Sequence, residues 1–135
     1  MSTIIDEFSR NAGTVWDVLK TNSPMTQINL LRIAQLDEKQ LHAAVGWLAR
    51  ENKIYQNGTV YELRETNLTE KIGGDAGKLW RILEAWGDVD ITNITRLAHI
   101  NEHDTYAALG WLARENKIEE KHGKTKDNLI RFKLR

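Results

Sequence analysis

The sequence has no cysteine, a single proline, no long apolar run and no excess of either charge. Without cysteine, a disulfide scaffold, a thiol nucleophile and a cysteine-ligated metal are excluded. No apolar stretch approaches the roughly 18 residues that a membrane-spanning helix needs. Lys plus Arg number 19 and Asp plus Glu also number 19, so no net charge attracts nucleic acid. The first residues lack the basic and then apolar layout of a signal peptide. We therefore expect a cytoplasmic protein with no membrane contact.

What the sequence does contain is an internal repeat. The run from Gly46 to Ile54 recurs letter for letter from Gly110 to Ile118, a shift of 64 residues. Between Ala12 and Ile54, 19 of 43 aligned pairs are identical without a gap. With 135 residues, the chain has room for two small domains. The repeat predicts two such units, unit 1 at residues 1–65 and unit 2 at residues 66–135.

Each unit shows the same order of predicted elements. Apolar residues at helical spacing predict a helix over residues 11–20, and a second short helix follows over 28–35. Asp37 is a typical N-cap residue for a third helix that ends near residue 52. The dipeptide Asn57-Gly58 then lies between β-forming residues, which predicts a hairpin whose two turn residues both take a positive φ. In unit 2 the connection within this hairpin is seven residues longer.

Three helices followed by a hairpin, with a tight turn between the second and third helix, is the order of a winged helix-turn-helix. Each unit resembles that superfamily. Its signature Gly-Trp-Leu-Ala-Arg-Glu-Asn-Lys-Ile is similar to that of a small bacterial winged-helix family. The resemblance implies a mainly α fold with small β-hairpins. We expect two tandem winged helix-turn-helix domains, packed as a pseudo-symmetric pair.

The resemblance also implies a way of binding DNA, in which the third helix enters the major groove and the hairpin contacts the backbone. Acidic residues at the starts of the third helices oppose this function, while the basic second hairpin favours it. The alternative for that hairpin is a solvated tip that protects an edge strand from aggregation. Carried over by position, the candidate DNA contacts are Lys39, His42, Arg50, Tyr106, Arg114, Lys121, Lys124 and Lys126.

An interaction role follows instead from the two sides of the third helix. Leu41, Val45 and Leu48 form one stripe that should face the core. The opposite side, here called the outer face, is also largely apolar and must be covered. The chain's own leader or hairpin is the favoured cover, ahead of the other unit or a second chain in a homodimer. The outer face of unit 1 consists of Lys39, Ala43, Gly46, Trp47 and Arg50, and that of unit 2 of His103, Ala107, Gly110, Trp111 and Arg114.

The remaining tryptophans divide into two kinds. Trp16 and Trp80 lie on the apolar stripe of the first helices, so we expect them in the core. Trp86 has no counterpart in unit 1, where Asn22 takes its place, and local packing is favoured over a partner contact. Trp47, Trp86 and Trp111 are therefore the candidate interface residues.

Enzyme chemistry finds no support in the sequence. The pattern from His99 to His103 matches an inverted zinc-protease motif, but the repeat places it on the bend between two helices. There is no phosphate-binding glycine loop. We expect no catalytic site, metal or cofactor. The preferred prediction is a DNA-binding transcriptional regulator or chromosome-associated protein that binds double-stranded DNA. The alternative is a protein-protein interaction module on the same scaffold.

Overall fold

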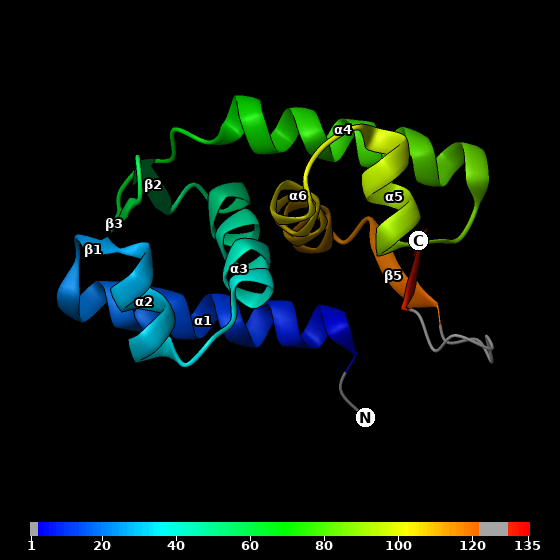
Figure 1. Ribbon diagram of the computed structural model, residues 1–135. Helices are drawn as coiled ribbons and strands as arrows, with labels where there is room; N and C mark the ends of the chain where they lie inside the picture. Colours follow the sequence, from blue (N-terminus) through cyan, green and yellow to red (C-terminus); the bar gives the residue numbers. More distant parts are fainter. Residues whose placement is uncertain (1–2, 122–129) are drawn as a thin grey trace.

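The computed structural model describes residues 3–121 and 130–135, and it confirms the predicted architecture of two tandem, mainly helical units. Figure 1 shows the third helices side by side between the two long first helices. Unit 1 comprises α1 (Ile4–Asn22), β1 (Met25–Thr26), α2 (Gln27–Ala34), α3 (Glu38–Arg50), β2 (Ile54–Asn57) and β3 (Val60–Leu63). Unit 2 comprises α4 (Thr69–Trp86), β4 (Val89–Asp90), α5 (Ile91–Ala98), α6 (Glu102–Arg114), β5 (Ile118–Lys121) and β6 (Arg131–Leu134).

The first helix of unit 1 is longer than predicted, because the leader is helical as well. It begins at Ile4 rather than near residue 11. Thr3 caps it by accepting a hydrogen bond from the backbone N–H of Asp6, and the Asp6 carboxylate accepts one from the N–H of Thr3. This reciprocal capping box satisfies two backbone donors at the helix start. The periodicity of residues 11–20 therefore marks only the second half of the helix.

Each hairpin gains a third strand that the sequence pattern did not predict. In unit 1, β1 pairs with β3 in antiparallel register, and β4 pairs with β6 in the same way in unit 2. The predicted turn also shifts by one residue. Asn57 pairs with Val60, so the turn residues are Gly58 and Thr59, and of the dipeptide Asn57-Gly58 only Gly58 has a positive φ, 62°. A turn of this kind needs glycine only at its first position.

The third helices form as predicted. Asp37 accepts a hydrogen bond of 2.8 Å from the backbone N–H of Gln40 and so caps α3, and Asn101 caps α6 in the same way. Leu41, Val45 and Leu48 are buried, as their spacing predicts. The core of unit 1 lies beneath this stripe.

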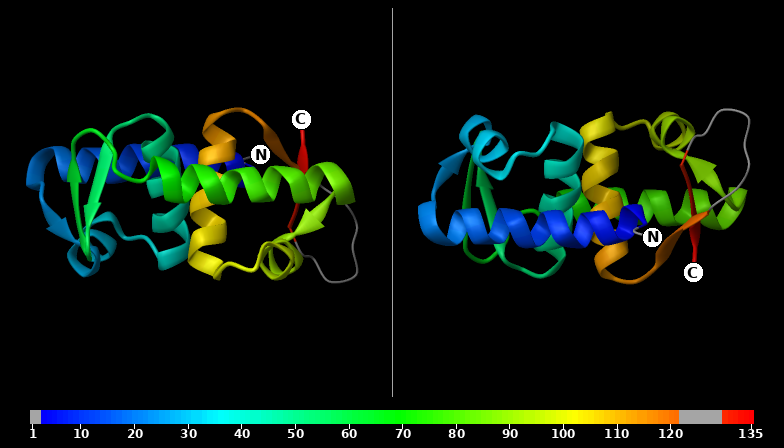
Figure 2. Two further views of the ribbon diagram at one scale, coloured as in Figure 1. Left: turned by 90° about the horizontal axis from the view of Figure 1, so that it is seen from above. Right: turned by 90° about the horizontal axis from the view of Figure 1, so that it is seen from below.

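The leaders are exchanged between the units. Phe8, on α1, is 3% exposed and packs in the apolar cluster of unit 2. Ile72, its counterpart on α4, packs in the cluster of unit 1. The backbone N–H of Ile4 also donates a 3.0 Å hydrogen bond to the carboxylate of Glu120 in unit 2. Figure 2 shows α1 and α4 on opposite sides of the α3–α6 pair. The packing of the two units therefore crosses the predicted boundary at residue 65.

Candidate binding surfaces

The outer faces of the third helices cover each other. Ala43 on α3 and Gly46 are buried against Ala107 and Gly110 on α6. A Cβ added at Gly46 would lie 1.8 Å from the carbonyl oxygen of Ala107, and one added at Gly110 would lie 2.0 Å from that of Ala43. The expected cover by the chain's own leader accounts for only part of this surface: Phe8 and Ile72 pack in the clusters that include Trp47 and Trp111, whereas the glycines contact the other unit. Glycine allows two helix backbones to approach more closely than a side chain permits, so the other unit provides the cover.

The basic residues of these faces are engaged at the same contact. Arg50 pairs with Glu115 at 3.1 Å, and Arg114 pairs with Glu51 at 3.0 Å in a reciprocal arrangement. Each guanidinium also lies over the indole ring of the other unit, at 5.8 Å from Trp111 and 6.0 Å from Trp47. The two arginines proposed as DNA contacts thus pair with carboxylates of the other unit, although their side chains remain exposed.

The opposite end of the helix pair carries the other three predicted helix contacts. Lys39 pairs with Glu102 at 3.3 Å, and Tyr106 lies beside it, lining the same small pocket. His42 stacks on His103 of unit 2, with 4.5 Å between ring centroids. All five helix residues predicted to contact DNA therefore lie at the contact between the units.

The two units differ at the positions of the stacked histidines. His42 occupies the position that Tyr106 takes in unit 2, and His103 takes that of Lys39. The Nε2 atom of His42 is buried and has no hydrogen-bond partner among the described residues. Burial lowers the pKa of His42, and His103 lowers it further, while Glu38 and Asp104 act in the opposite direction. The folded protein therefore disfavours the protonated form of His42.

Stability should consequently fall in mild acid. In the unfolded chain His42 has its ordinary pKa near 6.5, so below that pH the unfolded state binds more protons. We expect the unfolding equilibrium constant to rise by up to about tenfold per pH unit below pH 6.5. Urea titrations between pH 5 and pH 8 would measure it. His42→Tyr, which copies unit 2, should flatten this slope; an unchanged slope in that variant would assign the dependence to other groups.

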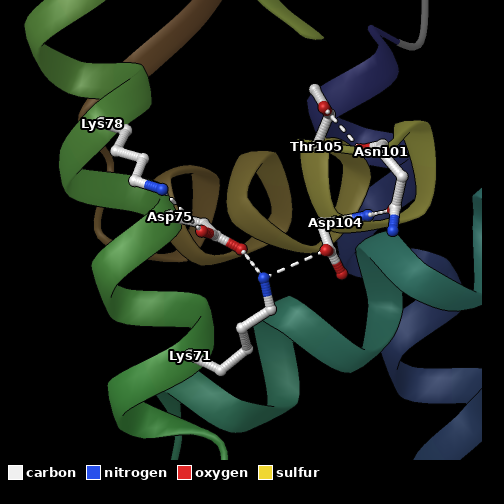
Figure 3. Close-up of polar contacts among 6 residues, drawn as sticks. All are labelled: Lys71, Asp75, Lys78, Asn101, Asp104 and Thr105. Atoms are coloured by element: carbon white, nitrogen blue, oxygen red, sulfur yellow. Dashed lines mark hydrogen bonds and ion pairs between the residues drawn. The ribbon is translucent and has the colours of Figure 1, made fainter. Parts of the chain in front are cut away.

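Lys71 links a buried carboxylate of α4 to the start of α6 on the same side of the molecule. Asp75 is 5% exposed and pairs with Lys71 at 2.7 Å and with Lys78 at 3.9 Å. Lys71 also reaches Asp104 at 3.0 Å, in the first turn of α6 (Figure 3). The hydrogen bond to Asp75 raises the pKa of Lys71. Unit 1 has Glu7, Asn11 and Gln40 at these positions, so the bridge is particular to unit 2. It fastens α4 to the start of α6.

The second wing is only partly described. Lys124 and Lys126, two of its three predicted phosphate contacts, lie outside the described residues. Lys121 hydrogen-bonds to Asp88, which Arg131 also approaches at 3.4 Å. The Lys121 ammonium holds the pKa of Asp88 below its ordinary value. Lys121 is therefore already neutralised by a carboxylate of its own unit.

Two tryptophan-walled grooves open at the arginine end of the helix pair. In unit 1 the groove lies between α1 and α3, has a volume of about 180 Å³, and includes Trp16 and Trp47. In unit 2 it lies between α4 and α6, has about 500 Å³, and includes Trp80 and Trp111. Trp80 is 36% exposed, so the prediction that it lies in the core is wrong. Trp16 is half-buried and lines the groove of unit 1. Trp16 and Trp80 both lie at the edge of the apolar stripe of their helices, so they face a groove rather than the core.

The three predicted interface tryptophans take different positions. Trp47 and Trp111 are half-buried and pack against both apolar clusters. Trp111 also covers Gly73 on α4, where an added Cβ would lie 3.2 Å from the ring. Trp86, at the end of α4, is 66% exposed. Trp86 thus lies on the surface rather than in the local packing that the sequence favoured.

Within residues 3–121 and 130–135, no three His, Asp or Glu side chains are grouped so as to hold a metal ion. The helices in this part of the chain are also too short or too polar to span a bilayer.

Comparison with known proteins reports the same repeat. A family model described as a winged helix-turn-helix domain (DUF2582) matches residues 6–67 and, a second time, residues 65–132. None of the curated proteins matches the chain.

Proposed function

This chain belongs to the DUF2582 family of winged helix-turn-helix domains, and we propose that it is a non-enzymatic protein-interaction module built on that fold. The supporting observation is that the outer faces of α3 and α6 bury each other. In DNA-reading members of the superfamily this face enters the major groove. Here it is occupied within the chain, while the two tryptophan-walled grooves remain open. Exposed aromatic residues around a groove are typical of protein-binding surfaces.

Groove-dependent capture tests this function. Gly77 lines the unit-2 groove and Gly74 does not; neither has any atom within 4 Å of an added Cβ. The variants Gly77→Arg and Gly74→Arg therefore add the same side chain to the same helix, inside and outside the groove. We expect immobilised wild type and Gly74→Arg to retain a common protein, or a second copy of the chain, that Gly77→Arg loses. Identical sets of bound proteins for all three would contradict the proposal.

DNA binding remains the second candidate, and one observation favours it. Arg32 on α2 and Arg96 on α5 are exposed at equivalent positions of the two units. Each donates a hydrogen bond only to an asparagine, Asn29 at 3.2 Å and Asn93 at 2.7 Å. Among the described residues no carboxylate pairs with either arginine. With no carboxylate beside them, Arg32 and Arg96 are well placed to contact phosphates.

Fluorescence anisotropy of a labelled random duplex, titrated with protein over a salt series, separates the two functions. For a protein-interaction module we expect no binding below about 10 μM at 0.15 M salt. Each neutralised phosphate adds about 0.9 to the slope of log K against log salt. Micromolar binding with a slope of several units would establish the DNA function instead. The variants Arg32→Ala with Arg96→Ala, and Lys121→Ala with Lys124→Ala and Lys126→Ala, would then show which surface is used.

A further inference from the structure

The two grooves share most of their lining residues but differ in volume. Seven lining positions carry identical residues: Ala12 and Ala76, Gly13 and Gly77, Trp16 and Trp80, Trp47 and Trp111, Leu48 and Leu112, Glu51 and Glu115, and Lys53 and Lys117. Even so, the unit-2 groove has about 500 Å³ against about 180 Å³ in unit 1. The difference must come from the residues around these shared positions.

In unit 1 two cations of the chain lie over the Trp16 ring of the groove. The ammonium of Lys20 lies 4.6 Å from the centre of the Trp16 ring, and that of Lys53 lies 5.8 Å from it. A cation within about 6 Å of an indole ring is attracted by the negative charge on the face of the ring. Trp16 thereby has partners within its own unit.

In unit 2 the same place is empty of cations. The residue equivalent to Lys20 is Glu84, which lines the groove and has no ion-pair partner among the described residues. Lys117 pairs with Glu115 at 3.4 Å, as Lys53 pairs with Glu51 at 3.8 Å, but only Lys53 also lies over the indole ring of its groove. Within the described part of the chain, no cation lies over the Trp80 ring, and the side chain is 36% exposed. An indole ring and an unpaired carboxylate therefore lie together in an open groove.

We propose that the unit-2 groove binds a lysine or arginine side chain of a protein partner, in the place that Lys20 occupies over Trp16. This inference rests on the proposed interaction function and specifies the chemistry of the partner. The face of the Trp80 ring attracts the cation, and the negative charge of Glu84 pairs with it. In unit 1 the equivalent residue, Lys20, is itself the cation over the ring. Arg81 also lines the groove, one turn before Glu84, so the cation binds at the Glu84 end.

Indole NMR with short peptides tests the proposal. The protein is labelled with ¹⁵N-tryptophan, and Trp80→Phe assigns the Trp80 signal. The probes are tetralysine and tetraglutamate, both acetylated and amidated so that their ends carry no charge. We expect tetralysine to shift the Trp80 indole signal with a millimolar Kd, and tetraglutamate to leave it unmoved. No shift with tetralysine, or equal shifts with both peptides, would overturn the proposal.

Charge-matched variants locate the binding. Glu84→Lys copies unit 1 and should close the groove with the chain's own ammonium, weakening tetralysine binding at least tenfold. Glu70→Lys makes the same charge change at an exposed position outside the groove and should leave binding within twofold. Conversely, Lys20→Glu should open the unit-1 groove and make the Trp16 signal respond. Undiminished binding to Glu84→Lys would show that the groove is not the site.

The two proposals fail in distinguishable ways. If Gly77→Arg loses a captured protein but tetralysine does not shift Trp80, the interaction function stands and the basic side chain is wrong. If tetralysine shifts the Trp80 signal but Gly77→Arg captures the same proteins as wild type, the groove binds basic side chains and the proposed protein-interaction function is wrong.

Discussion

Gly46→Ala is expected to lower the free energy of unfolding by about 3 kcal/mol or more. The new Cβ would lie 1.8 Å from the carbonyl oxygen of Ala107, and that oxygen belongs to a helix backbone that cannot move alone. The α3–α6 contact must therefore open. The cost outweighs the roughly 1 kcal/mol by which alanine favours a helix over glycine. Gly110→Ala should behave alike, because its Cβ would lie 2.0 Å from the Ala43 carbonyl oxygen.

Urea denaturation followed by tryptophan fluorescence would measure this loss. Gly74→Ala is the matched control, because this α4 glycine has no atom within 4 Å of an added Cβ. Without a clash, only helix propensity remains, so we expect Gly74→Ala to raise the free energy of unfolding by about 0.5–1 kcal/mol. If Gly46→Ala were as stable as Gly74→Ala, the two third helices would not be packed as described.

The second large effect concerns the exchanged leaders. Phe8→Ala should cost about 3–4 kcal/mol, because it removes a buried aromatic ring and leaves a cavity. The residue belongs to unit 1 by sequence but packs in the apolar cluster of unit 2. We therefore expect both units to unfold in one transition at a lower urea concentration.

Differential scanning calorimetry of Phe8→Ala would test that coupling. Ile28→Ala serves as the control, since Ile28 is 78% exposed and its truncation should change stability by less than about 0.5 kcal/mol. Two separate transitions, with only the one from unit 1 lowered, would mean that Phe8 does not stabilise unit 2.

Local signals in the sequence identified the elements, because capping, turns and helical spacing act over a few residues. Asp37 and the stripe of Leu41, Val45 and Leu48 are examples. The same spacing misplaced Trp80, since a position at the edge of an apolar stripe faces a groove or the core depending on what packs beside it. The repeat predicted the two units, and the order of the predicted elements within each indicated a winged helix.

Local sequence signals could not predict which element covers the outer face of each third helix. The outer face that contains Gly46 needed a cover, but nothing in the sequence distinguished α6 from the leader as the element that provides it. Arg50 and Arg114 were assigned to DNA by analogy, and their ion pairs with Glu115 and Glu51 depend on how the units meet. The exchange of Phe8 and Ile72 between clusters is likewise a property of the assembled pair.

Covalent connection gives this pseudo-two-fold pair a freedom that a dimer of identical chains lacks. In such a dimer every substitution appears twice, so both grooves and both ends of the interface change together. Here Lys20 lies over the indole of Trp16, whereas the equivalent residue Glu84 lines the groove of Trp80. His42 is likewise equivalent to Tyr106. A substitution in one unit can thus change a groove or a titratable group there while the equivalent position in the other unit keeps its residue. The two grooves of this pseudo-symmetric chain are therefore chemically distinct.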